Sequence, residues 1–511
     1  MNHWLSSFVC VPVLFASGLV CARAQAPAQA EPDARSVRTA QMEKELSGLS
    51  AELAQTQEQL QKAQQQIKEL QQELITMRGD SEGSADNLQT STEENASSSV
   101  NALSAAVTQI KEQQEVLQAE VAQHDQTKLE TVSKYRVRVT GLVLFNAFRN
   151  HGGVDDIDEP SYALPVAAAT SNVSTGAGFR QTILGLQGVG PQFMGARTSA
   201  NLSVDFFGGL AYASYGTSAG TVRMRTADVD LDWKANSLQF GLVTPLISPR
   251  SPDSYAAVAE PAMAAAGNLW AWAPQIAFRS RLPLHGDQNF GVEVGLLDTP
   301  SAVYNTATVV RTPSPGELSG QPAYESRLSW SGRDDESSQF AVSGYFGRQN
   351  YLNGDSANSW AATADWQQPL GSHVKLTGEA YRGVALGGLG GGVYKDFVPG
   401  NNPVSGVFEY RPLNAAGGWT QVKASFRPGL EANATFGEDD GFAADFHAVV
   451  LPATATAALL HARNTMVSAN LIYRPKTYFI ISPEYRRIWT WQITGLPSTA
   501  DIITLSAGYE F

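Results

Sequence analysis

The chain closes on Ile503 to Phe511, which reads ITLSAGYEF. Apolar residues occupy every odd position of this stretch, and small or polar residues occupy the even positions between them. Successive side chains of a β-strand point to opposite faces. A period of two therefore predicts a strand with one apolar and one polar face. Two aromatic residues, Tyr509 and Phe511, end the apolar face.

The same period recurs upstream, between residues 135 and 511. Alternating runs begin near Arg136, Asn201, Asp228, Trp360 and Glu484, and residues typical of turns separate them. Short alternating runs with turn signals between them are typical of all-β domains. We therefore expect residues 135–511 to form one β domain.

Two kinds of β domain produce this pattern. A soluble sandwich turns its apolar faces inward, whereas a transmembrane barrel turns them toward lipid and lines its lumen with polar residues. The polar faces here carry many ionic residues and have no apolar partner layer. Tryptophans near the ends of the expected strands suit the aromatic girdles of a membrane barrel: Trp330, Trp360, Trp366, Trp489 and Trp491. The pattern favours an all-β transmembrane antiparallel barrel.

Composition narrows the class of protein further. Charged residues are 17% and hydrophobic residues 43% of the 511, and the net charge is −13. Ordinary domains have about 25% charged residues and roughly 45–50% hydrophobic residues. This composition therefore disfavours an ordinary cytosolic enzyme. Beyond the extreme N-terminus no apolar run is long enough for a membrane helix. No basic stripe suggests binding to nucleic acid.

Residues 1–24 have the features of a secretory signal peptide. A mostly apolar stretch, Leu5 to Val20, precedes Ala22 and Ala24, which form the small-x-small pattern of a cleavage site. A membrane anchor is the alternative, but about 16 residues is short for a span. Cleavage after Ala24 would remove both cysteines, Cys10 and Cys21. The mature protein would then hold no disulfide or zinc-cysteine site.

A coiled coil is expected at residues 41–129, after a flexible linker at 25–40. Apolar residues from Met42 to Met77 recur at alternating steps of three and four, which is a heptad repeat. A Gly- and Ser-rich linker at 79–99 interrupts it, and a weaker repeat follows from Val100 to Val121. A lone helix cannot bury such a seam. Association with other copies is therefore favoured over packing on the helix's own domain.

Together these features resemble the trimeric outer-membrane porins of Gram-negative bacteria. The chain is most similar to DcaP-like porins, which carry an N-terminal periplasmic coiled coil, and more distantly to phosphate-selective porins. The stretches that carry the resemblance are 180–209, 267–281, 469–485 and the terminal Phe511. The resemblance implies a barrel of about 16 strands, with short periplasmic turns, longer outer loops and one inward-folded loop. At roughly 22–24 residues per strand and connection, residues 135–511 also give about 16 strands.

The resemblance also implies what the protein does and where. It implies an outer-membrane location with the coiled coil in the periplasm, and passive diffusion of small hydrophilic solutes without enzyme activity or cofactor. The expected partners are two further copies in a homotrimer, outer-membrane lipids, peptidoglycan near the coiled coil, and the barrel assembly machinery. That machinery would recognise Tyr509 and Phe511. No metal site is expected, because the seven histidines form no paired motif.

A long stretch without alternation, Leu246 to Ala273, is the candidate for the inward-folded loop. An ordinary surface loop is the alternative. Its candidate pore-constriction residues are Arg250, Asp253, Tyr255 and Glu260.

Arginines on polar strand faces are candidates for lining the lumen opposite this loop. These are Arg279, Arg281, Arg136 and Arg138. Arginine keeps its charge and binds carboxylate or phosphate in a fork, so a preference for small anions such as organic acids or phosphate is one hypothesis. Structural ion pairs bracing the wall are an equal alternative at each position.

Two further groups bear on this hypothesis. The acidic ladder Asp228, Asp230 and Asp232 would favour cations instead. Arg223 and Arg225 share their parity with Val229 and Leu231, which places them toward the lipid-facing rim.

Three other functions remain open. A barrel enzyme would need a clustered Ser/His or carboxylate set, which the sequence does not show. A structural barrel tethered to the cell wall or a partner through its coiled coil would be closed to ions. A soluble secreted adhesin would need no detergent.

Overall fold

The structure is a computed structural model. It describes residues 136–511 except 166–171, 211–219, 285–286, 303–310, 333–336, 352, 453–459 and 495. The expected signal peptide at 1–24, linker at 25–40 and coiled coil at 41–129, with its break at 79–99, lie outside the described residues. Among the residues it does describe, no helix has the length and apolarity to cross a membrane.

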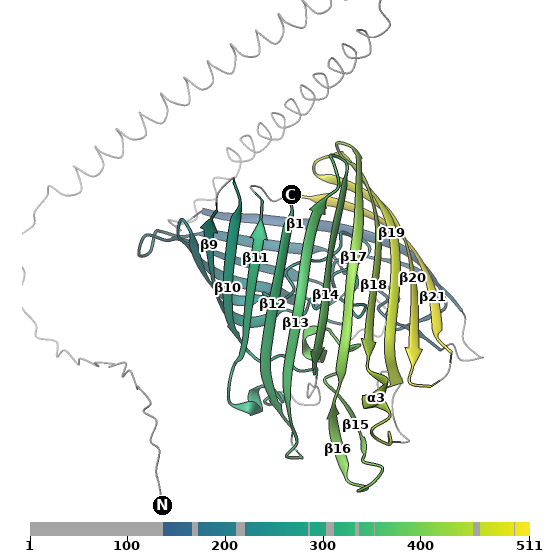
Figure 1. Ribbon diagram of the computed structural model, residues 1–511. Helices are drawn as coiled ribbons and strands as arrows, with labels where there is room; N and C mark the ends of the chain where they lie inside the picture. The colour runs from purple at the N-terminus through teal and green to yellow at the C-terminus, as the bar shows by residue number, and fades with distance from the viewer. Residues whose placement is uncertain are drawn as a thin grey trace, which may run out of the picture. The chain divides into compact units, whose positions relative to one another are not determined.

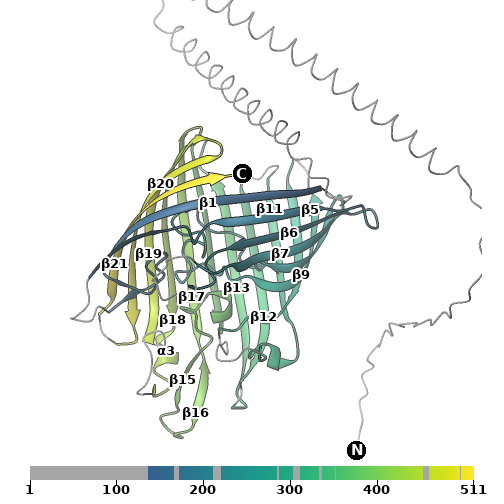
Figure 2. The ribbon, with the colours of Figure 1, turned by 180° about the vertical axis from the view of Figure 1, so that it is seen from behind.

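The described strands form one closed antiparallel barrel (Figures 1 and 2). Closure comes from β1, which pairs with β21 on one side and with β4 and β5 on the other. The wall strands are β1 (Arg136–His151), β4 (Val173–Gly178), β5 (Ile183–Val189), β6 (Arg197–Asp205), β7 (Arg223–Asp232), β8 (Asn236–Val243), β9 (Ala273–Pro283), β10 (Asn289–Leu297), β11 (Ala323–Ser331), β12 (Gln339–Asn350), β13 (Ser356–Pro369), β14 (Val374–Val384), β17 (Asn414–Arg427), β18 (Leu430–Gly441), β19 (His461–Lys476), β20 (Phe479–Gln492) and β21 (Ser498–Glu510).

The number of wall positions agrees with the sequence-based expectation of about 16. The sheet has 17 strands, but β4 and β5 pair with successive parts of the same strand, β1. They therefore occupy one position, and the described strands fill 16 positions around the barrel. The prediction of an antiparallel barrel of about 16 strands is confirmed, and the soluble sandwich is wrong because the sheet closes on itself.

Connections differ between the two ends of the barrel. At one end, here the short-turn end, neighbouring strands are joined by brief segments such as 428–429 and 477–478. At the other, here the long-loop end, segments such as 244–272 and 385–413 join the strands. Figure 1 shows β15, β16 and α3 at the long-loop end and the C-terminus at the opposite end. The small elements of the connections are β2 (Gly153–Val154), β3 (Ala163–Leu164), η1 (Glu317–Ser319), η2 (Gly387–Leu389), β15 (Phe397–Asn401), β16 (Phe408–Pro412) and α3 (Ala443–Phe446).

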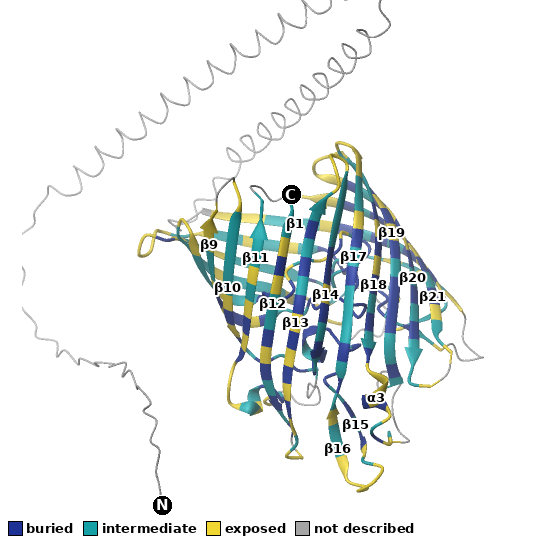
Figure 3. Ribbon diagram, in the orientation of Figure 1, coloured by how far each residue is buried: buried dark blue, intermediate teal, exposed yellow. Residues whose placement is uncertain are grey.

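Burial alternates along the wall strands as the sequence pattern predicts (Figure 3). On β21, Ile503 is 59% exposed, whereas Ser506 on the opposite face is fully buried. The apolar faces therefore point outward and the polar faces point into the barrel, the reverse of a soluble protein. The last residue belongs to the wall, because Phe511 exchanges two backbone hydrogen bonds with Gly141 of β1, at 2.9 and 3.0 Å.

The five tryptophans expected in girdles lie in two groups along the wall. Trp330 and Trp366 lie near the short-turn ends of β11 and β13. Trp360 lies toward the long-loop end of β13, and Trp489 and Trp491 lie near that end of β20.

The placement of Arg223 and Arg225 toward the lipid-facing rim is wrong. The β6–β7 register skips one residue of β7, because Ser203 lies opposite Thr226 and Val204 lies opposite Met224. This bulge reverses the parity of β7, since one extra residue moves every side chain beyond it to the other face. Both arginines therefore point into the barrel.

Candidate functional site

The segment 244–272, here called the inner loop, connects β8 to β9 and lies inside the barrel. Its first residues bind the wall at β11 and β13: the Leu246 N–H donates to Glu325 Oε2 at 2.8 Å, and Thr363 Oγ1 donates to the Ile247 carbonyl at 2.7 Å. Both wall side chains are buried and point inward. The loop therefore folds back into the lumen from the long-loop end.

The inner loop also reaches the far side of the lumen. The Asp253 carboxylate lies 2.7 Å from Lys423 Nζ of β17, and Ser254 Oγ donates to Glu484 of β20 at 2.5 Å. Farther along, Asn464 of β19 donates to the Ala265 carbonyl at 3.1 Å. These partners are more than 150 residues away in the sequence, so the loop crosses the lumen rather than lining one strand.

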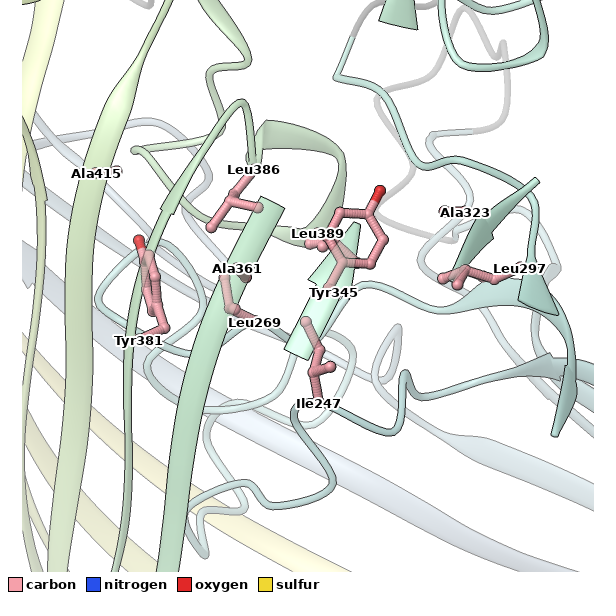
Figure 4. Packing of buried hydrophobic residues seen from close by; sticks show 11 residues of the cluster. Ile247, Leu269, Leu297, Ala323, Tyr345, Ala361, Tyr381, Leu386, Leu389 and Ala415 are labelled. Carbon is pink, nitrogen blue, oxygen red and sulfur yellow. The ribbon is translucent and has the colours of Figure 1, made fainter. Parts of the chain in front are cut away.

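Apolar packing holds the loop against the wall (Figure 4). Ile247 and Leu269 of the loop belong to one buried cluster with Tyr345 of β12 and Tyr381 of β14, and with Leu386 from the segment after β14. This cluster makes the loop part of the packed structure.

Glycine allows the closest approach between the loop and the wall. A Cβ atom on Gly437 of β18 would lie 2.3 Å from the Ala266 carbonyl oxygen. A Cβ atom on Gly267 of the loop would lie 2.3 Å from the Gly418 carbonyl oxygen. Gly267 also has a φ of +97°, which favours glycine.

Arg250 joins the loop to a chain of ion pairs along the wall. Its guanidinium lies 2.8 Å from Asp365, and Asp365 also lies 3.0 Å from Arg327. The Arg327 guanidinium also lies 2.6 Å from the Glu293 carboxylate, and this carboxylate lies 3.1 Å from the Arg279 guanidinium. Each carboxylate thus lies between two arginines. Arg250 and Arg327 are mostly buried, so their charges are largely neutralised within the wall.

The other candidate residues of the loop are also engaged with the structure around them. Arg474 donates to the Tyr255 hydroxyl at 2.7 Å. The Glu260 N–H donates to Glu159 Oε1 at 3.1 Å, and Tyr394 donates to the Glu260 carboxylate at 3.4 Å. Burial is the main cause that raises the pKa of Glu260 to about 7.

Arg279 and Arg281 point into the lumen at the short-turn end, as their alternation predicts. They line a cavity of about 430 Å³ between β6 and β12. Its charged lining residues are Arg197, Lys234, Arg279, Arg281 and Arg327, with Asp232 and Glu293. The guanidinium of Arg281 makes no hydrogen bond or ion pair with any residue that the structure describes, whereas Arg279 is paired with Glu293.

The two candidate arginines of the first strand lie apart from the inner loop. In the backbone register Arg136 lies opposite Val189 and Arg138 lies opposite Gln187, at the short-turn end of β1. Arg138 is exposed. The structure therefore does not bring this pair together with the loop residues.

Sequence analysis missed the arginines that hold the middle of the inner loop. Arg223 and Arg225 both bind Asp205 of β6, at 2.7 and 2.9 Å, and both donate to the Ala259 carbonyl, at 2.7 and 3.2 Å. Their guanidinium groups also lie over the ring of Trp272, at 5.4 and 4.8 Å. The sequence did contain a signal for these arginines. A charge that faces lipid is energetically costly, so two arginines on an apparently lipid-facing strand face indicate that the inferred parity is wrong.

The lumen is filled unevenly. Inward-facing residues of β13, β20 and β21 are almost completely buried, as Asp365, Glu484 and Ser506 illustrate. Inward-facing residues of β6, β7 and β8 remain partly exposed, as Asn201 and Asp230 illustrate. The water-accessible part of the lumen therefore lies along the short-turn half of the wall from β6 to β10, because Asp205, Gln275 and Leu297 toward the long-loop end are buried.

The acidic ladder borders this accessible side. Asn201 donates to Asp228 at 2.7 Å and to Asp230 at 3.2 Å. Asp232 lies farther toward the short-turn end and lines the basic cavity. Among the residues described, no three His, Cys, Asp or Glu side chains are arranged to hold a metal ion.

The barrel is similar to solved outer-membrane proteins. The outer membrane channel DcaP of Acinetobacter baumannii matches with a TM-score of 0.55 and 17% identity, over 74% of this chain and 99% of that one. The anion-selective porin from Comamonas acidovorans matches with a TM-score of 0.48 and 12% identity, over 74% of this chain and 100% of that one. OmpF of Salmonella typhi matches with a TM-score of 0.43 and 13% identity, over 73% of this chain and 97% of that one. The first match confirms the resemblance to DcaP-like porins at the level of the fold.

Comparison of the sequence alone adds nothing to this match. No protein-family model matches the chain, and no curated protein does.

Proposed function

We propose that the chain is a bacterial outer-membrane channel through which small hydrophilic solutes diffuse passively. The observation that carries this proposal is the uneven filling of the lumen. The inner loop packs against β13, β17 and β20 and leaves the short-turn halves of the polar inner faces of β6 to β10 accessible to water. A polar path inside an outward-apolar barrel lowers the barrier for a hydrated solute to cross lipid.

The inner loop forms the constriction in this proposal, and its four candidate residues have different roles. Arg250 anchors the loop to β13 and Asp253 anchors it to β17, two positions farther around the wall, through ion pairs. Tyr255 and Glu260 fix its middle through Arg474 and Tyr394. The loop therefore sets the width of the path, and charges on the accessible side set its selectivity.

A preference for small anions is supported by the cavity at the short-turn end. Five basic and two acidic side chains line it. Glu293 is shared between Arg279 and Arg327, so the cavity keeps a net positive charge. Rings of Arg and Lys favour anions in pores. Asp228 and Asp230 oppose this preference farther along the path.

A homotrimer is supported by the unequal height of the barrel wall. β6, β7 and β8 have 9, 10 and 8 residues, whereas β19 and β20 have 16 and 14. The lower side of the wall suits contact with neighbouring copies, and the expected coiled coil would hold three copies together.

Planar-bilayer recording of the detergent-extracted protein in a KCl gradient tests the proposal. We expect current steps in groups of three and a reversal potential of the sign that anion preference gives. A current that shows cation preference would overturn the proposed anion preference but not the proposed channel. Silence from a folded trimer would overturn the channel and favour the structural tether.

A further inference from the structure

Outward-facing charges are confined to one part of the barrel wall. Among the described residues, the outward faces of β5 to β11 carry no charged side chain. By the alternation of burial, the outward faces of β14 to β21 carry several. Arg427 lies at the short-turn end. The others form a belt toward the long-loop end: Arg382, Glu438, Asp440, Arg463, Arg487 and Asp501. A charge facing hydrocarbon is costly, and its cost falls near the membrane surface. This belt therefore marks where the wall meets headgroups.

Two arginines of this belt lie on tryptophan rings. The Arg463 guanidinium lies 4.0 Å from the ring centre of Trp491, and the Arg487 guanidinium lies 5.2 Å from that of Trp489. In the β19–β20 register Arg463 lies directly opposite Trp491. Tryptophan is typical of membrane–water interfaces. The two rings therefore hold the guanidinium groups at the level where lipid phosphates lie.

Both arginines keep donors that the protein does not use. Arg463 makes no hydrogen bond or ion pair with any described residue. Arg487 lies 3.4 Å from Asp501, and its side chain is still 39% exposed. Arg382 differs, because it donates to the Ala415 carbonyl at 3.0 Å and to Asn414 at 2.8 Å.

We propose that Arg463 and Arg487, lying on Trp491 and Trp489, bind the phosphates of a lipid headgroup at the long-loop end of the barrel. A guanidinium donates to phosphate in a bidentate fork, and a basic group near the surface attracts anionic lipid. The proposal rests on the membrane location given under Proposed function. It adds a lipid site on the outer wall, which is separate from the pore.

The spacing of the two arginines limits the headgroup. Arg487 lies opposite Val467, four residues from Arg463 along β19. Four residues of a strand span about 13 Å, which is the separation of the two backbone positions. The guanidinium groups themselves lie on rings two residues apart along β20, so a headgroup with two phosphates can place one phosphate on each.

Neighbouring acidic groups also limit the site. Asp440 lies opposite Arg463 across β18 and β19, and Asp501 pairs with Arg487. Glu438 accepts a hydrogen bond from Thr465 at 2.7 Å. These carboxylates offset part of the basic charge, so affinity depends on two directed phosphate contacts rather than on bulk charge.

The test measures binding of diphosphoryl lipid A to the full-length, detergent-purified protein by native mass spectrometry. Lipid A that lacks both of its phosphates is the reference ligand. We expect the double variant R463Q/R487Q to bind the diphosphoryl form roughly 25-fold more weakly, about fivefold for each arginine. R463K/R487K should retain part of the binding, because lysine keeps the charge but not the fork.

Arg427 provides the matched control. It lies at the short-turn end of β17, with its guanidinium 6.0 Å from the ring centre of Tyr473. R427Q should leave lipid binding unchanged. Equal loss in R427Q, or unchanged binding in R463Q/R487Q, would overturn the proposal. A double variant that dissociates into single copies when lipid is absent would also overturn it, because this face would then be an interface between copies.

Two further measurements separate the lipid site from folding and from the channel. A heat-dependent shift in gel mobility establishes that the double variant is folded. Its single-channel conductance should equal that of the parent protein. A closed channel that still binds diphosphoryl lipid A would overturn the proposed function and leave the lipid site standing.

Discussion

The Arg250 guanidinium of the inner loop lies 2.8 Å from the Asp365 carboxylate of β13, which is completely buried. The two residues are 115 positions apart in the sequence. Asp365 also binds Arg327, so one carboxylate holds both the loop and the wall. This contact gives the inner loop a fixed position at the start of its path across the lumen.

Removal of the Asp365 charge should loosen the inner loop. In D365N, Arg250 and Arg327 lose their shared carboxylate, and breaking a buried pair costs about 3–5 kcal/mol. We expect a lower unfolding temperature and a larger, noisier single-channel conductance. R281Q is the control for the unfolding temperature, because Arg281 lies on the accessible wall and binds no residue of the loop in the described structure. A quiet conductance of parental size in D365N would contradict the anchoring role.

Charge changes on the accessible wall should shift ion selectivity in opposite directions. R281E places a negative charge in the basic cavity and should move the reversal potential in a KCl gradient toward cation preference. D230N removes a carboxylate from the same path and should move it toward anion preference. Equal reversal potentials in both variants and the parent would show that ions take another route.

A methyl group at Gly437 should displace the inner loop. The new Cβ would lie 2.3 Å from the Ala266 carbonyl oxygen, a distance that real contacts do not reach. We expect G437A to destabilise the barrel by about 1–3 kcal/mol and to change the conductance. Gly344 is the matched control, because its nearest neighbour in the same test is Ser326 Oγ at 3.9 Å. G344A should therefore leave the unfolding temperature and the conductance unchanged.

Stability should depend on pH through Glu260. Burial raises the pKa of this carboxyl from 4.5 to about 7, so folding favours the protonated form. The contribution of Glu260 to the free energy of unfolding is therefore greatest below pH 4.5. This contribution falls by roughly 3 kcal/mol in all as the pH rises from 4.5 to about 7. E260Q cannot ionise and should lose this part of the pH dependence.

The measurement is the temperature of the gel-mobility shift at pH 5 and pH 8. E260Q should unfold at a higher temperature than the parent at pH 8, and the difference should shrink at pH 5. A difference of equal size at both pH values would exclude ionisation of Glu260 as the cause.

Several properties of the barrel could be predicted from local sequence. Alternation in stretches such as Ile503 to Phe511 correctly predicts which face turns outward. The length of the β domain correctly predicts about 16 strands. The lack of alternation from Leu246 to Ala273 correctly picks out the segment that leaves the wall. These properties depend on neighbouring residues, because the side-chain period of a strand is two wherever the strand lies.

The partners of the charged residues could not be predicted in the same way. Arg250 pairs with Asp365 and Asp253 with Lys423 only because the loop crosses the lumen. A loop sequence does not specify which of many inward-facing residues it will meet. Candidate site residues were therefore found by type, whereas their pairing with the wall was left open.

The sequence by itself determined the architecture: an outward-apolar barrel of about 16 strands with polar residues inside and one long segment outside the alternating pattern. Only the tertiary structure determined that Arg223 and Arg225 point inward, that Arg250 is paired with a buried carboxylate, and that water reaches the short-turn half of the wall from β6 to β10. The reason is physical. A repeating period survives in every local stretch, whereas a one-residue bulge or a contact across the lumen depends on residues far apart in the chain.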